Sequence, residues 1–165
     1  MITLILDNIR SVHNVGSIFR TSETLGIKKI YCIGTTPTPL DRFGRKRKDF
    51  AKVALGAEDI LNWEHLGEVT ALIKKLKKSG YKIIALEQSP KSVDYKSVKI
   101  GDLCEDNSAS HMIKVAIILG NEVDGVSSKL LKLADIIAEI PMAGKKESLN
   151  VSVAGAVFLF RLLDH

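Results

Sequence analysis

The chain of 165 residues is poor in the residues that build metal centres and disulfide frameworks. Its two cysteines, Cys32 and Cys104, have no metal-ligand spacing and are too few for a disulfide scaffold. The four histidines show no metal-ligand spacing either. We therefore expect no metal ion and no disulfide-rich secreted fold.

Long apolar runs are also absent. No segment approaches the stretch of about 20 apolar residues that crosses a bilayer. Residues 1–7 contain neither a basic region nor a small-residue cleavage site, so they do not resemble a signal peptide. The sequence thus predicts a cytoplasmic protein without a membrane partner.

Three common ligand-binding motifs are missing. No Gly-x-Gly-x-x-Gly follows a predicted strand, which argues against a dinucleotide-binding Rossmann site. The glycines Gly120 and Gly125 are not followed by the lysine and hydroxyl residue of a phosphate-binding loop. A Gly-x-Ser-x-Gly nucleophile elbow is absent as well.

Positive charge is concentrated in one stretch. The whole chain carries a net charge of +5, and the segment 42–52, which holds one acid, Asp49, carries a charge of the same size. Its basic residues are Arg42, Arg45, Lys46, Arg47, Lys48 and Lys52. Such a cluster favours a polyanionic partner, with nucleic acid first, although a solvated surface loop has the same composition.

Apolar periodicity predicts an α/β fold in a single domain spanning residues 1–165. We expect strands at residues 2–6, 29–33, 82–86, 114–119 and 136–140. We expect helices at residues 15–25, 48–55, 68–79, 128–134 and 150–163, with Ser127 as N-cap of the fourth. Residues 34–44 and 89–107 are expected to be connectors. This alternation is typical of a mostly parallel sheet with helices on both faces.

The last predicted helix, residues 150–163, is apolar almost all round. One sheet face covers only one side of a helix, so its other apolar side needs a further partner. We therefore expect a homodimer that uses this helix.

Three polar segments fall at strand ends or helix starts, where ligands bind in open α/β sheets. The first contains Asn14, which is a possible helix N-cap, and Arg20. Because Arg20 follows two apolar residues in a predicted helix, we expect it to be buried and to need an anion, or an ion pair with Glu23. The other two segments are the turn 120–125 and the stretch 148–152, where serine and asparagine can cap the last helix.

Together, in order and spacing, these segments resemble the three motifs of the SpoU/TrmH branch of the SPOUT RNA methyltransferases. The first motif matches Asn14, Gly16, Arg20 and Thr21. The second matches Leu119-Gly120-Asn121-Glu122 with Gly125. The third matches Ile140-Pro141-Met142, Ser148-Leu149-Asn150-Val151-Ser152 and Ala154. The chain departs from the family where Val12 replaces a frequent proline, and it lacks the extra terminal elements with which many relatives grip RNA.

The resemblance implies a deep C-terminal trefoil knot, S-adenosylmethionine as cofactor, and transfer of its methyl group to a ribose 2′-hydroxyl of RNA. The motifs do not distinguish tRNA from rRNA; we favour tRNA as the substrate and keep rRNA as the alternative. The residues implied to bind the cofactor are Leu86, Glu87, Leu119, Gly120, Ile140, Met142, Ser148 and Leu149. The implied catalytic and structural polar set is Arg20, Glu122, Ser148, Asn150 and Asn14. For RNA phosphates we expect Arg10, Arg42, Arg45, Lys46, Arg47 and Lys48.

The resemblance suggests Arg20 as the base that removes the hydroxyl proton. A guanidinium with a pKa above about 12 resists deprotonation, so a phosphate clamp that stabilises the developing alkoxide is the alternative. Glu122 is a candidate to orient Arg20, while Ser148 and Asn150 are candidates to order the loop around donor and ribose. An RNA-binding module with a degenerate site and a small-molecule methyltransferase remain alternative functions.

Overall fold

The computed structural model describes residues 1–103 and 113–164. Cys104, His111, His165 and the end of the expected 89–107 connector lie outside the described residues. Among the described residues, no helix is long and apolar enough to span a membrane, and no cluster of histidine, cysteine or carboxylate side chains suits a metal ion.

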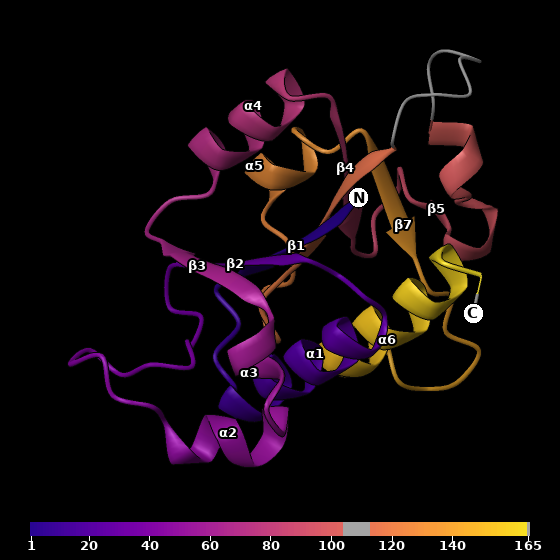
Figure 1. Ribbon diagram of the computed structural model, residues 1–165. Helices are drawn as coiled ribbons and strands as arrows, with labels where there is room; N and C mark the ends of the chain where they lie inside the picture. Colours follow the sequence, from indigo (N-terminus) through magenta and orange to yellow (C-terminus); the bar gives the residue numbers. More distant parts are fainter. Residues whose placement is uncertain (104–112, 165) are drawn as a thin grey trace.

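Seven strands of the described chain form one sheet, in the order β3-β2-β1-β6-β4-β7-β5 (Figure 1). Every pairing among them is parallel. The strands are β1 (Ile2–Asp7), β2 (Lys29–Ile33), β3 (Asn62–Leu66), β4 (Tyr81–Leu86), β5 (Val93–Asp94), β6 (Lys114–Leu119) and β7 (Ile136–Glu139). The parallel α/β sheet predicted from the sequence is therefore confirmed.

The two central strands, β1 and β6, are buried along almost their whole length. Because successive side chains point to opposite faces, their apolar residues divide between two cores. Leu4 and Ile117 belong to one core, whereas Ile5 and Ile118 belong to the other. This explains why β6 reads as a continuous apolar run in the sequence.

Helices cover both faces of the sheet (Figure 1). The first core is closed by α1 (Val12–Thr24), α2 (Lys48–Ala54), α3 (Ala57–Ile60) and α6 (Val151–Leu162). The second core is closed by α4 (Thr70–Lys78) and α5 (Ser128–Leu131). Two short 3-10 helices, Tyr95–Ser97 and Ile100–Leu103, lie in the segment before β6.

Several details of the predicted elements were wrong: among them, helix α3 was not predicted, and the helix expected at 128–134 ends at Leu131. The first helix begins at Val12, because the Ser11 hydroxyl caps it by accepting a hydrogen bond from the Asn14 amide. Asn14 is therefore not the N-cap. The strands β3 and β5 were missed as well, since their side chains are mostly exposed and show no apolar pattern. Ser127 is the N-cap residue of α5, as expected, although its side chain makes no capping hydrogen bond.

Candidate functional site

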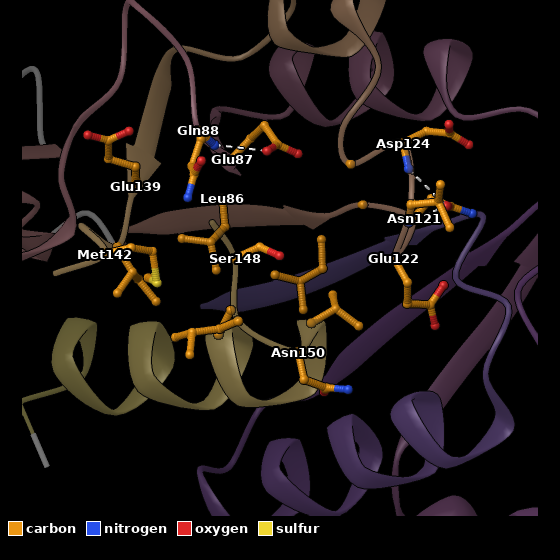
Figure 2. Close-up of a pocket in the computed structure, with 18 residues that line it drawn as sticks. Leu86, Glu87, Gln88, Asn121, Glu122, Asp124, Glu139, Met142, Ser148 and Asn150 are labelled. Atoms are coloured by element: carbon orange, nitrogen blue, oxygen red, sulfur yellow. Dashed lines mark hydrogen bonds between the residues drawn. The ribbon is translucent and has the colours of Figure 1, made fainter. Parts of the chain in front are cut away.

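A cavity of about 480 Å³ opens where β4, β6 and β7 end, beside the start of α6 (Figure 2). Leu86, Leu119 and Glu139, the last residues of these strands, all contribute to its wall. The structure brings together all eight residues expected to bind the cofactor, namely Leu86, Glu87, Leu119, Gly120, Ile140, Met142, Ser148 and Leu149. Glu122 and Asn150 of the expected catalytic set also line it.

The cavity wall combines apolar side chains with negative charge. Its carboxylates are Glu87, Glu122, Asp124 and Glu139, and the described residues that line it include no lysine, arginine or histidine. A phosphate-bearing ligand would meet repulsion in this surrounding, whereas a cationic ligand would be attracted. Asp124, Glu139 and the neighbouring Gln88 also line the cavity and were not expected as site residues.

The turn after β6 is fixed by glycine and by Glu87. Asn121 and Gly125 exchange two backbone hydrogen bonds of 3.1 and 3.0 Å. A Cβ atom on Gly120 would overlap the backbone of Gly125, so only glycine fits there. The carboxylate of Glu87 accepts a hydrogen bond of 2.6 Å from the Val126 amide, which ties the end of β4 to this turn.

Asn121 links the same turn to the end of β1. Its side-chain amide donates to the Asn8 carbonyl at 2.7 Å, and its side-chain oxygen accepts from the Val123 amide at 2.8 Å. Asn8 itself has a φ of 54°, a left-handed conformation that asparagine tolerates better than most residues. The position of Asn121 inside the second motif was the signal that could have marked it as a site residue.

Glu122 holds the start of α1. Its carboxylate accepts hydrogen bonds from the Arg10 amide at 2.9 Å, from the Ser11 amide at 3.1 Å and from the Asn14 side chain at 2.8 Å. Burial raises the pKa of Glu122, but these hydrogen bonds outweigh burial and lower its pKa below the ordinary value. The expectation that Glu122 orients Arg20 is not met, since the bonds of its carboxylate go to Arg10, Ser11 and Asn14.

Asn14 continues this chain of contacts to the last helix. Its side-chain oxygen accepts a 3.0 Å hydrogen bond from the side chain of Asn150. Asn150 is the N-cap of α6, as one reading of the sequence expected, and its side-chain oxygen accepts from the Ser152 amide at 2.9 Å. The three sequence motifs are thus joined through Glu122, Asn14 and Asn150.

Arg20 lies apart from this network. The expectation that it is buried was wrong: Arg20 is exposed on α1 and does not line the cavity. Within the described part of the chain it makes no ion pair, so the expected pair with Glu23 is absent. The reason is helical geometry, since Ile18 and Phe19 face the core while the next residue turns towards solvent.

The basic stretch forms a hairpin between β2 and α2, followed by the start of α2. Three of its cations pair with carboxylates, namely Arg45 with Asp41, Lys46 with Asp59 and Arg47 with Asp49, at 2.8, 2.7 and 2.7 Å. Arg42, Lys48 and Lys52 make no ion pair with the described residues. Arg10 lies near the cavity and pairs loosely, at 3.9 Å, with Asp124.

These features define a parallel α/β protein with a ligand cavity at the carboxyl ends of its central strands. The profile of the SpoU rRNA Methylase family matches residues 1–160. The chain therefore belongs to the SpoU rRNA Methylase family, and the resemblance drawn from its three motifs is confirmed.

Named relatives of the chain modify different RNAs. The chain is 30% identical over 164 residues to a tRNA (guanosine(18)-2′-O)-methyltransferase of Borreliella burgdorferi. This match covers 98% of this chain and 66% of that protein. The chain is also 30% identical over 156 residues to the 23S rRNA (guanosine-2′-O-)-methyltransferase RlmB of Neisseria meningitidis, covering 94% of this chain and 55% of that protein. The chain thus spans less than two thirds of the length of these relatives.

A solved structure supports the fold. The crystal structure of the Aquifex aeolicus TrmH/SpoU tRNA modifying enzyme superposes with a TM-score of 0.79 at 26% sequence identity. The match covers 99% of this chain and 74% of that chain.

Proposed function

We propose that this chain transfers a methyl group from S-adenosylmethionine to the 2′-hydroxyl of a ribose in RNA, with tRNA as the substrate class. The observation that carries the proposal is the cavity after β4, β6 and β7, where the second and third sequence motifs of an RNA methylase family form an apolar and acidic wall. The Borreliella relative, a tRNA methyltransferase, supports tRNA. The Neisseria relative makes rRNA the second candidate.

The residues of the cavity fit this cofactor. Its adenine is flat and largely apolar, which suits Leu86, Ile140, Met142 and Leu149. Its sulfonium and ammonium groups outnumber its one carboxylate, which suits a wall that holds four acids. The cavity of about 480 Å³ is also within the usual range for small-molecule sites. When bound, S-adenosylmethionine supplies a methyl group on a positively charged sulfur.

The chain's own residues would orient the reaction. The chain of contacts from Glu122 through Asn14 to Asn150 fixes the starts of α1 and α6 relative to each other. Because Glu122 and Asn150 line the cavity, this network is suited to position the ribose next to the donor. Ser148 belongs to the loop that leads into α6 and lines the cavity, which suits a role in ordering that loop.

Arg20 is proposed to act on the RNA side of the reaction. Its exposure on α1, outside the cavity wall, keeps its positive charge away from the cationic donor and leaves it accessible to a phosphate. Clamping that phosphate and stabilising the developing alkoxide is the role we favour over general-base catalysis, since a guanidinium holds its proton.

Two structural expectations belong to this proposal. The deep C-terminal trefoil knot is proposed from membership of the family, and insertion of β6 between β1 and β4 is compatible with it. A homodimer through α6 is proposed because Val153, Val157 and Phe160 remain 48, 37 and 40% exposed. Their spacing of four and three residues places them on one face of the helix.

Calorimetry with S-adenosylhomocysteine, the demethylated product, tests the cofactor. We expect binding, and we expect no binding of NAD⁺ or ATP at the same concentration. Mapping of 2′-O-methyl groups in the RNA of a deletion strain, followed by restoration with the purified protein, tests the reaction. The proposal would be contradicted if the protein did not bind the product and the deletion strain had lost no 2′-O-methyl group. Binding of RNA without binding of the product would favour a degenerate RNA-binding module.

A further inference from the structure

The hairpin of residues 40–46 projects away from the body of the protein, between β2 and α2 (Figure 1). Leu40 and Lys46 pair as an antiparallel bridge. At the tip, the Asp41 carboxylate accepts hydrogen bonds from the amides of Phe43 and Arg45, at 2.8 and 2.9 Å. Gly44 has a φ of 76° and completes the turn. The tip is thus held in shape by its own hydrogen bonds.

The base of the hairpin is fixed to the rest of the chain. The Arg47 amide donates a 2.9 Å hydrogen bond to the Pro39 carbonyl. The Lys46 ammonium reaches across to Asp59, which lies on α3, at 2.7 Å. A projecting element that is anchored at its base presents its tip at a defined distance from the body, as a recognition element requires.

Phe43 stands at this tip and is 66% exposed, the most exposed aromatic side chain of the protein. Two guanidinium groups lie near its ring, those of Arg42 and Arg45, with Cζ at 4.7 and 5.0 Å from the ring centre. A single exposed apolar residue needs no explanation by itself. An aromatic ring between arginines on a projecting basic hairpin, however, is the combination with which proteins bind unpaired nucleotides.

We propose that Phe43 stacks on an unpaired base of the RNA substrate while Arg42 moves from the ring to a neighbouring phosphate, an inference that rests on the function proposed above. Arg45 is held in place because its Nε and Nη2 atoms both lie 2.8 Å from Asp41. Arg42 has no ion pair with the described residues, so it is the cation that is able to leave. The exchange is favourable because an exposed cation–π contact is weaker than a base–aromatic stack.

Stacking on Phe43 also determines which RNA structures the hairpin binds. Every base has a face on which an aromatic ring packs, so stacking discriminates poorly between sequences. A base inside a duplex, in contrast, already has its faces covered by its neighbours. Phe43 therefore selects an RNA loop or single strand over a helix, and directs the enzyme to unpaired regions of its substrate.

Binding of labelled short oligoadenylate and of a short RNA duplex to the full chain tests this inference. The variants are F43A, F43L, which keeps an apolar side chain, and F43W, which keeps a stacking ring. We expect F43A and F43L to weaken oligoadenylate binding by about tenfold. The salt dependence should not change, because no charge is lost. F43W should bind as the wild type does, and duplex affinity should stay constant.

Two controls accompany the variants. Ile60 on α3 is another strongly exposed apolar residue, so I60A should bind oligoadenylate as the wild type does. F43W adds a second tryptophan to Trp63, and oligoadenylate should quench its fluorescence more than that of the wild type.

Equal oligoadenylate affinity of wild type, F43A and F43L would overturn the inference about Phe43 and leave the proposed function standing. That result is also the one expected if Phe43 contacts a protein partner instead. Failure of the wild type both to bind any RNA and to methylate RNA from the deletion strain would overturn the proposed function together with the inference.

Discussion

Gly120 is a residue of the cavity wall at which a side chain does not fit. A Cβ atom there meets the backbone of Gly125, which is unable to move aside without breaking the turn. Gly120→Ala should therefore lower stability by about 1–3 kcal/mol and strongly weaken binding of S-adenosylhomocysteine. Gly144→Ala is the matched control, because its Cβ meets open space and its φ is not positive. Urea unfolding and calorimetry measure both effects, and equal behaviour of the two variants would contradict this account of the turn.

Glu122 makes the stability of the α1 start depend on pH. Its pKa is lowered in the folded protein, so the folded state favours the ionised carboxylate. The stabilisation is complete above the ordinary pKa of 4.5 and is lost as the pH falls through the lower folded value. Glu122→Gln removes this contribution. The difference in unfolding free energy between wild type and variant should thus be largest near neutrality and shrink below pH 4.5; a constant difference would count against it.

Arg20 separates catalysis from donor binding. Because it is exposed and outside the cavity, Arg20→Ala should abolish methyl transfer and leave S-adenosylhomocysteine affinity unchanged. Arg20→Lys keeps the charge but loses the planar fork that engages phosphate at two points. Lysine should be nearly as inactive as alanine in single-turnover assays. Substantial activity of the lysine variant would favour simple electrostatics, and full activity of the alanine variant would remove Arg20 from the mechanism.

At single residues, the sequence located the site better than it located the bonds within it. The motifs placed Asn14, Glu122 and Asn150 among the polar residues that matter, and the structure joins them. Their actual partners were not predictable, because the hydrogen bond between Asn14 and Asn150 spans 136 positions of the chain. Nothing local in the sequence indicates that the Glu122 carboxylate binds Arg10, Ser11 and Asn14 at the start of α1. The exposure of Arg20 is not indicated locally either.

Among the helices and strands, the buried ones were predicted from the sequence more accurately than the exposed ones. The central strand β6 was predicted with its observed bounds because both of its faces are covered, which demands an unbroken apolar run. The edge strand β3 has mainly exposed side chains and is held by backbone pairing to β2, which leaves no hydrophobic pattern to read. The starts of helices were less certain, as Ser11 shows, because several polar residues near a helix start are able to cap it.

The hairpin and the start of α2 should contribute unequally to RNA binding. Arg42 and Lys48 make no ion pair with the described residues, so each should release a counterion from RNA. R42Q and K48Q should each reduce the slope of log affinity against log salt by about 0.7–0.9. K46Q should reduce it less, since Lys46 is already paired with Asp59. K74Q on α4, which packs against the opposite face of the sheet, should leave the slope unchanged. If the salt dependence of RNA binding were the same for the wild type and all variants, the basic segment would be a solvated surface loop without a role in RNA binding.

The whole molecule is expected to be a dimer. Val157→Asp places a charge on the exposed apolar face of α6, and sedimentation velocity should show monomers where the wild type is dimeric. Val153→Glu, at the most exposed position of that face, is the second variant, since it disturbs the core of a monomer least. Ile60→Asp, on the exposed side of α3, should leave the wild-type dimer intact. A monomeric wild type at micromolar concentration would contradict the expectation.

The strand order also has a consequence for how the protein is made. Strand β1 pairs on one side with β2, but its other partner is β6, which lies more than a hundred residues later in the chain. During synthesis, one edge of β1 therefore stays unpaired until residues 114–119 have left the ribosome. Unpaired edges of apolar strands invite aggregation, and pairings so distant in sequence form slowly. We therefore expect the refolding yield of the purified chain to fall as its concentration rises.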